Sequence, residues 1–308
     1  MNPQRAIGVD LGGTKILAGV VGRDGSVEER REWPTPLDSQ EELLQALARS
    51  VEDVLEDDVA AIGFGIPSTI DQRSGRAVTS VNIPLADLDL RAWMRERFGL
   101  PVGIDNDANA ATLAEWAHGA GRGTQHMIML TLGTGVGGGL ILDGKPYRGA
   151  VGAGGELGHM VIDVDGPPCQ GACTGHGHLE ALASGHAATE AAREAFGPAA
   201  DAHRLVRLAN EGDETAIEIL TRLGRNLGAG IATLVNVFNP ELVVIGGGFS
   251  AAGEFLFAPA REMVAREALS PARDLVRIVR AELGTAAGLV GAGLVAFEAL
   301  DADAARAA

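Results

Sequence analysis

The sequence predicts an α/β enzyme made of two related domains, and three observations lead to this fold class. A strand–glycine–strand unit occurs twice, roughly 120 residues apart, and a repeat of that size indicates two related domains facing one another. The chain has 308 residues, enough for two domains that each bury a sizeable core. Its 43 glycines, 46% hydrophobic residues and 4% aromatic residues are typical of a glycine-rich α/β enzyme.

The first strand–glycine–strand unit opens the chain. Residues 6–11 form an apolar run that breaks at Gly12 and Gly13, resumes over residues 16–21 and turns at residues 23–25. This pattern predicts a hairpin with glycines at its tip, at the start of a sheet.

Further elements follow from the spacing of apolar residues. Ser39 and Glu42 have the spacing of a capping box, and leucines and valines follow at helical spacing as far as Leu55. Beyond this helix we expect a buried strand over 59–66, a helix over 91–98, a strand over 102–104 and a helix over 108–117.

The opening pattern then recurs. We expect a strand over 127–132, a break at residues 133–135 and a strand over 136–142, so that residues 10–14 and 131–135 occupy matching places. After these come predicted helices near 187–196 and 214–237, a strand over 242–245 and a C-terminal helix over 286–300.

Charge and cysteine content exclude several classes of protein. A formal net charge of −16 argues against a general nucleic-acid binder or a protein that binds anionic membranes. The N-terminus lacks the pattern of a secretory signal, and no run approaches the ~20 apolar residues of a membrane span. Two cysteines in so long a chain argue against a disulfide framework. We therefore expect a cytoplasmic protein.

Three glycine clusters are candidates for phosphate or nucleotide contact, since glycine lets backbone amides approach phosphate closely. They are the tip at Gly12, Gly13 and Thr14, the tip at Gly133, Thr134 and Gly135, and the run at Gly246, Gly247 and Gly248. No Walker-type phosphate loop is present. Lys15 either adds a positive charge near the phosphates or is an ordinary surface lysine.

Residues 105–109, with the sequence Asp-Asn-Asp-Ala-Asn, lie at a predicted strand-to-helix junction. One side chain here is expected to cap the helix by accepting hydrogen bonds from its first N–H groups. Three such residues in a row exceed what a cap needs. A carboxylate at the end of a strand is also well placed to take a proton from a substrate hydroxyl, so both interpretations stay open.

The segment from Gly155 to Glu180 contains both cysteines of the chain and three of its seven histidines. His159, Cys169, Cys173 and His178 offer two thiolates and two imidazoles, a tetrahedral ligand set that suits Zn²⁺. His176 competes with His178 for the fourth position. The alternative is a pair of buried thiols with surface histidines.

These motifs together resemble the ROK family of sugar kinases and repressors, in its bacterial glucokinase branch. The resemblance extends over nearly the whole chain, and it is carried by residues 10–15, 65–67, 106–109, 132–135, 155–159 and 177–180. It implies a duplicated actin-like (ribonuclease H-like) ATPase fold, with two domains around a cleft. We expect a small domain over 1–118, a large domain over 119–287 that carries the zinc loop, and a helix at about 288–303 that packs back on the small domain.

The resemblance also implies ATP-dependent phosphorylation of a hexose 6-hydroxyl group, with glucose as the expected substrate. Asp107 matches the catalytic base, and Asp10 matches the acidic residue near the nucleotide-bound Mg²⁺. The residues that match sugar contacts are Asn106, Glu156, His159 and Glu180, with Asn82 and Ser68 as further candidates. Gly12, Gly13, Thr14, Lys15, Gly133, Thr134 and Gly135 match the phosphate loops, and Gly247 and Gly248 the adenosine side. The zinc is expected to be structural, and the family implies a homodimer or homotetramer.

The sequence departs from the family pattern at two places. His178 stands where the family's loop has its last cysteine and Gly171 where it has its first, so that Cys169, two residues earlier, would supply the missing thiolate. Ser68 stands where a glycine often follows the proline; its hydroxyl either contacts the sugar or caps a turn.

Several rival functions remain open at this stage. A sugar-responsive repressor would need a DNA-binding segment before the first hairpin, where only about six residues stand. A sugar-binding protein without catalysis is opposed by Asp107 and the two phosphate loops. Among kinases, fructose, mannose, N-acetylmannosamine or allose could replace glucose, and polyphosphate could replace ATP.

Overall fold

The computed structural model describes residues 4–80 and 83–307, which divide into two compact units. The first unit takes in the described residues of Met1–Gly123, Pro146–Gly155 and Glu282–Ala308. The second unit consists of Thr124–Lys145 and Glu156–Ala281. The short segment Pro146–Gly155 thus joins the first unit although the chain before and after it belongs to the second. The sequence did not predict this segment's place, and the expected boundary at residue 118 stays a prediction.

The first unit contains a five-stranded sheet in the order β3-β2-β1-β4-β8. The strands are β1 (Arg5–Leu11), β2 (Lys15–Gly22), β3 (Val27–Pro34), β4 (Val59–Ile66) and β8 (Val102–Asn106). β1 pairs antiparallel with β2, as the predicted hairpin requires, and parallel with β4, which pairs parallel with β8. A small antiparallel sheet completes the unit, with β5 (Ser68–Asp71), β6 (Arg76–Ser80) and β7 (Leu88–Asp89).

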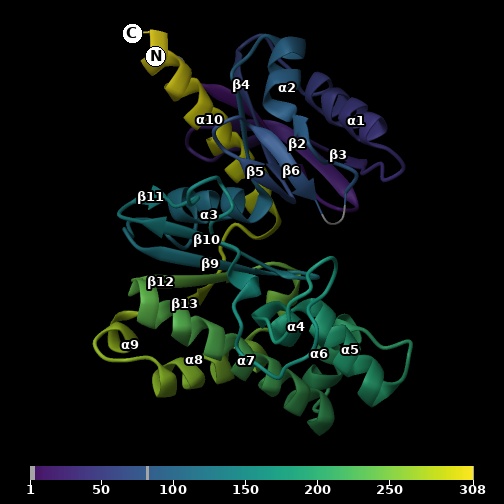
Figure 1. The fold of residues 1–308 in the computed structure, drawn as a ribbon, viewed down its shortest axis with the longest axis vertical. Coiled ribbons are helices and arrows are strands. Elements are labelled where there is room, and N and C mark those ends of the chain that lie inside the picture. Colours follow the sequence, from purple (N-terminus) through teal and green to yellow (C-terminus); the bar gives the residue numbers. More distant parts are fainter. Residues whose placement is uncertain (1–3, 81–82, 308) are drawn as a thin grey trace. The chain divides into compact units, whose positions relative to one another are not determined.

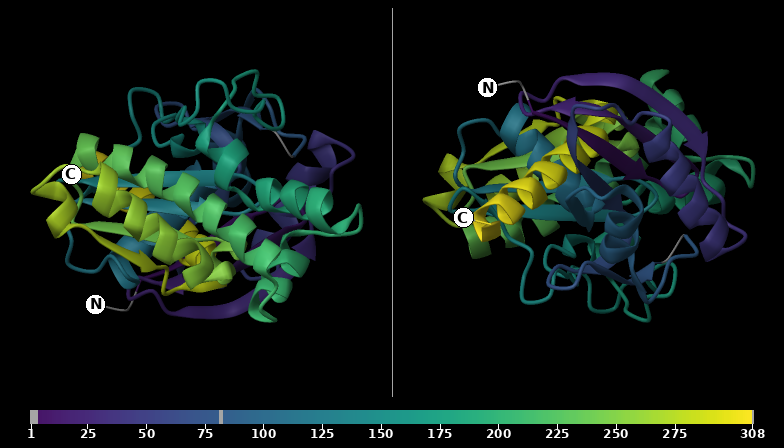
Figure 2. Two further views of the ribbon diagram at one scale, coloured as in Figure 1. Left: turned by 90° about the horizontal axis from the view of Figure 1, so that it is seen from below. Right: turned by 90° about the horizontal axis from the view of Figure 1, so that it is seen from above.

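The helices of the first unit are α1 (Gln40–Glu52), α2 (Leu90–Phe98), α3 (Asp107–His118) and α10 (Ala287–Ala307), which follows the short 3-10 turn η3 (Gly284–Ala286). α10 comes from the far end of the chain and packs on β1, β4, β8 and α3 (Figures 1 and 2). The contact is close because the strands carry glycines at it. A Cβ atom at Gly8, Gly63 or Gly103 would overlap the backbone of α10. These glycines are therefore required by helix–sheet packing.

By length and composition, α10 with η3 is the one helix within residues 4–80 and 83–307 that could cross a membrane. Half of its apolar stretch is buried inside the first unit, which accounts for its apolar composition without a bilayer.

The second unit repeats the sheet pattern of the first. Its strands are β9 (Met127–Leu132), β10 (Val136–Leu142), β11 (Lys145–Pro146), β12 (Leu242–Gly246) and β13 (Arg277–Arg280), in the order β11-β10-β9-β12-β13. β9 pairs antiparallel with β10 and parallel with β12, which pairs parallel with β13. The place of β9 in this sheet is that of β1 in the other, so the predicted duplication is confirmed.

Helices cover the sheet of the second unit (Figure 1). They are η1 (Leu157–His159), α4 (Leu179–Ala183), α5 (Gly185–Phe196), α6 (Ala202–Asn210), α7 (Glu214–Phe238), η2 (Gly248–Ala252), α8 (Glu254–Glu267) and α9 (Ala272–Leu275). α7 and α8 pack closely because glycines of α7 lie at the contact. A Cβ at Gly224 or Gly228 would lie 2.6 Å from a backbone oxygen of α8. Buried side chains from these helices and from β9 and β12 make one continuous core.

The predicted elements are all present, with ends that shift by a few residues. Ser39 is the N-cap of α1, and its side chain accepts a hydrogen bond from the backbone N of Glu42. α10 continues seven residues beyond the predicted end at residue 300. The sequence did not predict β3, β5, β6, β7, β11, β13, α6, α8 or α9. β3 was missed because six of its eight residues are exposed and mostly charged, and α8 because Pro259 lies inside it.

Candidate active site

The carboxyl ends of β1, β4 and β8 meet at one edge of the first unit's sheet, because these strands run parallel. Their ladders pair Asp10 with Gly65 and Ile66 with Asn106. In open α/β sheets, ligands bind at this kind of edge. The described first-unit residues predicted to contact or act on the sugar lie here, namely Ser68, Asn106 and Asp107, and so does Asp10, which was predicted to lie near the Mg²⁺.

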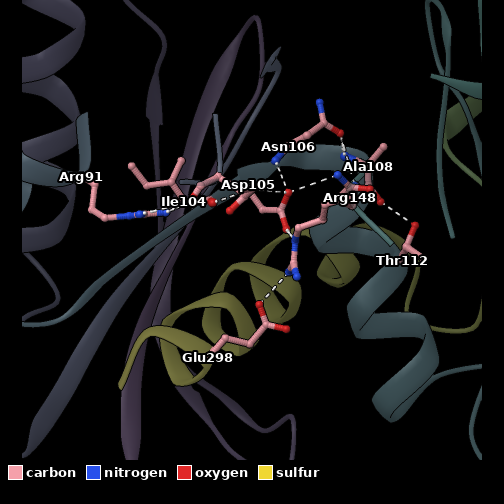
Figure 3. A network of polar contacts seen from close by, with 10 residues as sticks. Arg91, Ile104, Asp105, Asn106, Ala108, Thr112, Arg148 and Glu298 are labelled. Carbon is pink, nitrogen blue, oxygen red and sulfur yellow. Dashed lines mark hydrogen bonds and ion pairs between the residues drawn. The ribbon is translucent and has the colours of Figure 1, made fainter. Parts of the chain in front are cut away.

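The junction between β8 and α3 carries three polar side chains with different contacts (Figure 3). Asp105 is 1% exposed, and its Oδ1 accepts a hydrogen bond from the backbone N of Asn106 at 2.8 Å. Asn106 is the N-cap of α3, because its Oδ1 accepts hydrogen bonds from the backbone N of Ala108 and of Asn109. Asp107 is half-buried in the first turn, and its Oδ1 accepts from the backbone N of Ala108 at 2.9 Å. Since Asn106 supplies the cap, the cap does not require Asp107.

Asp10, at the end of β1, has an unusual ionisation. Burial and the negative charge of Asp107 raise the pKa of Asp10 from 3.8 to about 6, while Lys15 and Arg30 act in the opposite direction. The first turn of α10 touches this carboxylate, because a Cβ at Gly288 would overlap it. Two carboxylates that influence one another's ionisation are typical of a site that binds a divalent cation or transfers a proton.

The first glycine tip is held by backbone contacts. The backbone N of Gly12 donates to the carbonyl oxygen of Lys15 at 2.9 Å, and the Thr35 hydroxyl donates to that of Gly12 at 2.8 Å. Gly13 is half-buried and Thr14 is exposed. Lys15 forms an exposed ion pair with Glu32 at 3.0 Å, which favours its interpretation as a surface lysine.

Two further predicted sugar contacts differ in what the structure says of them. Ser68 is 4% exposed, and its hydroxyl donates to the carbonyl oxygen of Thr79 at 2.8 Å. This bond joins β5 to β6 and favours the interpretation in which Ser68 fixes the turn. Asn82 lies outside the described residues.

The second glycine tip lies in the second unit and is braced from several sides. Glu180 accepts a hydrogen bond from the backbone N of Val136 at 2.8 Å, and a Cβ at Gly135 would overlap the same carboxylate. The carbonyl oxygen of Gly133 accepts from the backbone N of Gly185, and that of Thr134 from the backbone N of His186. The start of α5 therefore fixes this tip.

A cavity of about 470 Å³ opens beside the second tip. Gly133 and Thr134 line it together with Gly248, so it joins two of the glycine clusters that the sequence singled out. Gly247 adopts a φ of 82°, and a Cβ there would overlap the backbone of Leu132. Only glycine fits this close approach. The volume lies within the range of about 300–1,000 Å³ that is usual for small-molecule sites.

The sequence did not identify the other residues that line this cavity. They come from α5, α6 and η2 and the residues beside them: Gly185, His186, Thr189, Asp201, Ala202, His203, Val206, Phe249, Ala251 and Ala252. α6 was not predicted at all, so no pattern pointed to His203. A usable signal was Ser184-Gly185, since Ser184 caps α5 with its side chain.

The Cys–His cluster, which we define as His159, Cys169, Cys173 and His178, comes together in the second unit. One ligand atom from each lies within 4.8 Å of the others. The Nδ1 atoms of the two histidines are 3.2 Å apart. Cys169 Sγ lies 3.8 Å from His159 Nδ1, and Cys173 Sγ lies 3.6 Å from His178 Nδ1. In this group, His178 rather than His176 takes the fourth position.

These separations fit a tetrahedral zinc site. Bonds of about 2.3 Å to sulfur and 2.05 Å to nitrogen imply edges of roughly 3.3 Å between nitrogens and 3.6 Å between sulfur and nitrogen. Without a cation, burial and a hydrogen bond with Cys173 raise the pKa of the Cys169 thiol to about 12. A metal would therefore have to displace protons on binding.

The remaining predicted sugar contacts of this unit lie next to the cluster in the chain or in space. Glu180 Oε1 accepts from Cys169 Sγ at 3.7 Å while its Oε2 holds the second tip. Glu156 and His159 are exposed at the two ends of η1, and the carbonyl oxygen of Glu156 accepts from the backbone N of His159. Glu156 and His159 are thus joined by one backbone hydrogen bond, and His159 is itself a member of the cluster.

The duplicated sheets, each with a glycine-tipped hairpin and parallel strands beside it, define an actin-like α/β fold with two domains. A sequence model described as the ROK family matches residues 6–299. The chain belongs to the ROK family.

Two relatives and one solved structure show which kinds of ROK protein this chain is similar to. The chain is 36% identical to a glucokinase of Thermotoga maritima over 96% of its own length and 98% of that protein's. It is 33% identical to an N-acetylmannosamine kinase of Escherichia coli, over 94% of this chain and 97% of the relative. A ROK family glucokinase from Streptomyces griseus, solved in complex with glucose and AMPPNP, superposes with a TM-score of 0.84 at 34% identity and covers 96% of this chain and 99% of that one.

Proposed function

We propose that this chain is an ATP-dependent sugar kinase that phosphorylates the 6-hydroxyl group of a hexose, with glucose as its principal substrate. The observation that carries the proposal is the β8–α3 junction, where Asn106 caps the helix and Asp107 stands beside the carboxylate of Asp10. The similarity to glucokinases over nearly the full length of the chain supports glucose and ATP.

In the proposed reaction, Asp107 accepts the proton of the sugar hydroxyl group as that oxygen attacks the γ-phosphorus of ATP. The bond between the γ-phosphorus and the bridging oxygen breaks, and ADP leaves. Such transfers depend mainly on positioning and on charge stabilisation. Asp10 would hold the Mg²⁺ that accompanies the nucleotide, which supplies positive charge to the phosphates when bound.

The proposed nucleotide site is the cavity of about 470 Å³ in the second unit. Gly133, Thr134 and Gly135 would face the phosphates with backbone amides, and Gly248 with Phe249 would contact the adenosine. The tip at Gly12, Gly13 and Thr14 would contribute amides from the first unit. Its exposed Thr14 and half-buried glycines leave room for a phosphate group.

The sugar's other hydroxyl groups are assigned to Asn106 of the first unit and to Glu156, His159 and Glu180 of the second. In the Cys–His cluster His159 uses Nδ1, so its Nε2 is the ring atom that would reach a sugar hydroxyl. Zn²⁺ bound to His159, Cys169, Cys173 and His178 would stiffen this segment. It would thereby support sugar recognition without entering the reaction.

The base assignment is tested by Asp107→Asn, measured with a coupled assay of ADP release and with glucose binding by calorimetry. We expect kcat to fall by about 10³-fold or more while the glucose Kd changes little, because the amide cannot accept the proton. The matched control is Asp213→Asn. Asp213 also stands at a helix N-terminus, as the cap of α7, and asparagine caps nearly as well. Substantial turnover by Asp107→Asn would overturn the assignment.

The zinc assignment is tested by metal analysis of the purified protein and of Cys173→Ser. We expect about one zinc per chain in the wild type and a large loss in the variant. A rise of about 10-fold or more in the glucose KM should accompany that loss, as is usual when the support of a binding residue is removed. A folded, zinc-free protein with an unchanged glucose KM would contradict the link between metal and sugar.

N-acetylmannosamine is the second candidate substrate, because the kinase for that sugar is 33% identical to this chain. Values of kcat/KM over glucose, mannose, fructose, allose and N-acetylmannosamine, each with ATP and with polyphosphate, separate the alternatives. A higher kcat/KM for any sugar other than glucose would replace glucose in the proposal.

The proposed setting is the cytoplasm, with a hexose and ATP as partners rather than nucleic acid or membrane, and with a homodimer or homotetramer as the assembly. A net charge of −16 supports the exclusion of nucleic acid. Light scattering on the eluted protein tests the assembly.

A further inference from the structure

The segment Pro146–Gly155, which we call the return segment, is attached to the first unit at two points. Gly152, with a φ of 93°, lies so close to β5 that a Cβ there would overlap the carbonyl oxygen of Ile70. The backbone N of Gln72 also donates to the carbonyl oxygen of Val151 at 3.4 Å. The second attachment is the side chain of Arg148.

Arg148 bridges two carboxylates of the first unit (Figure 3). Its Nε lies 2.5 Å from Oδ2 of Asp105, and its Nη2 lies 2.6 Å from Oε2 of Glu298 on α10. The two acids differ in exposure: the Asp105 side chain is 1% exposed and that of Glu298 is 41% exposed. Arg148 is therefore the cationic partner of a fully buried carboxylate.

Asp105 in turn organises the residues that surround the proposed base. Its Oδ1 accepts hydrogen bonds from the backbone N of Asn106, from Nδ2 of Asn109 and from Nε2 of Gln72, at 2.8 to 3.2 Å. These three donors come from the last residue of β8, the first turn of α3 and the β5–β6 turn. All three bonds share one acceptor oxygen, so they depend on a single orientation of the Asp105 carboxylate.

A buried carboxylate that loses its cation must take up a proton, admit water or move, since an unpaired buried charge is costly. Each outcome would alter the bond from Asn106 to Asp105. Asp107 is the next residue, and a misplacement of about 1 Å in a catalytic group is enough to reduce a rate by roughly 100-fold.

We propose that Arg148 is a positioning residue for phosphoryl transfer, which acts through Asp105 to fix the β8–α3 junction on which Asn106 and Asp107 stand. The inference rests on the proposed function for its kinetic consequences. Arg148 is not among the residues proposed to contact the sugar or the nucleotide. It also belongs to the segment that leads directly into Glu156, so one side chain connects the strand before the base to the chain that presents a sugar contact.

The kinetic test compares Arg148→Met, Arg148→Lys and the matched control Glu298→Gln. We expect Arg148→Met to lower kcat by about 100-fold and to raise the glucose KM by a smaller factor, because Asn106 is the one assigned sugar contact that stands on this junction. Arg148→Lys keeps a cation beside Asp105, so its kcat should be at least about a tenth of the wild-type kcat. Glu298→Gln removes only the charge on the other side of Arg148 and should stay within about threefold of wild-type kcat.

A double-mutant cycle separates positioning from general damage. In the Asp107→Asn background, Arg148→Met should cause no further loss of kcat, because the group that it positions is already gone. An equal 100-fold loss in both backgrounds would mean that Arg148 serves the fold alone and would overturn the proposal. Wild-type kcat in Arg148→Met would overturn it as well.

Hydrogen–deuterium exchange tests, without reference to activity, whether Arg148 fixes the β8–α3 junction through Asp105. Peptides that cover residues 104–112 should exchange faster in Arg148→Met than in the wild type or in Glu298→Gln. If the wild type phosphorylates no hexose, the proposed function fails. Faster exchange in Arg148→Met would then still support the inference that Arg148 fixes the junction through Asp105. Unchanged exchange would overturn that inference.

Discussion

The two glycine-tipped hairpins have the same place in their sheets but are held in different ways. In both, the first glycine of the tip donates its backbone N–H to a carbonyl oxygen across the turn, from Gly12 to Lys15 and from Gly133 to Gly135. The tip of β1–β2 is otherwise fastened by Thr35, the residue that follows β3. The tip of β9–β10 is fastened by Glu180, Gly185 and His186, which lie roughly 50 residues further along the chain.

The residue two positions before each tip also differs. Asp10 stands where the second hairpin has Thr131, so only the first hairpin carries a carboxylate at this position. The second hairpin instead borders the cavity of about 470 Å³. Under the proposed function, both turns of the duplicated pattern would face phosphates, while the first would add the charge of Asp10 and the second would border the nucleotide site. The predictions below test this division.

The largest effect is expected from Asp10→Asn. We expect kcat to fall by about 10²- to 10³-fold, since the amide carries no charge for the Mg²⁺ that accompanies ATP. In the wild type, kcat/KM should fall on the acid side with an apparent pKa near 6, the value to which burial and Asp107 raise the pKa of Asp10 in the protein without Mg²⁺. A pH–rate profile in which Asp10→Asn keeps the same acid limb would contradict this assignment.

The same substitution should have the opposite effect on stability. The pKa of Asp10 rises from 3.8 to about 6 on folding, so the ionised carboxylate costs folding free energy above that pH and nothing well below 3.8. At about 1.4 kcal/mol per pKa unit, Asp10→Asn should stabilise the protein by on the order of 3 kcal/mol at pH 7.5. Denaturant unfolding at pH 7.5 and at the lowest pH that the fold tolerates measures this gain, which should shrink with falling pH.

The next prediction compares the loss of stability when a methyl group is added to each glycine tip. Gly135→Ala places a Cβ against the Glu180 carboxylate, whereas a Cβ at Gly12 would lie 3.4 Å from the nearest atom, the carbonyl oxygen of Lys15. We expect Gly135→Ala to destabilise the fold by about 1–3 kcal/mol and Gly12→Ala by less than about 0.5 kcal/mol. Thermal unfolding of both variants checks the contrast, and equal losses would remove the distinction between the tips.

The smallest effect is expected from Lys15→Met in the first tip. Lys15 and Glu32 are both about half exposed, and such pairs contribute roughly 0–1 kcal/mol. The free energy of unfolding should change by less than about 0.5 kcal/mol, and the KM for ATP by less than about threefold. A tenfold rise in that KM would show that Lys15 contacts the phosphates after all.

The repeated hairpins could be predicted because their apolar runs and glycines lie close together in the sequence. The packing of α10 on the first unit was expected only from the family resemblance, since the glycines that admit it, such as Gly63, meet a helix more than 200 residues away. Nothing in a sequence distinguishes a strand glycine that accommodates a helix from one that ends a turn.

The site was predictable in kind but not in detail. A run of Asp, Asn and Asp predicts a helix cap and a carboxylate that could accept a proton. Only the structure shows that Asn106 is the cap and that Asp105 is buried. The sequence did not identify Arg148 as part of the site, because an arginine between glycine-rich stretches is typical of a solvated surface. His203 was missed because the amphipathic pattern of α6 was not recognised.

The glycine contacts of α10 have a consequence for the order in which the chain folds during synthesis. β1, β4 and β8 leave the ribosome first, but the helix that fills the space against Gly8, Gly63 and Gly103 is made last. The second unit is complete in sequence by Ala281, before α10 exists. Domains commonly fold in the order in which they are made. In this chain the half that is translated first must wait for the final residues, so a ribosome that stops short of them would release a protein whose N-terminal half never closes.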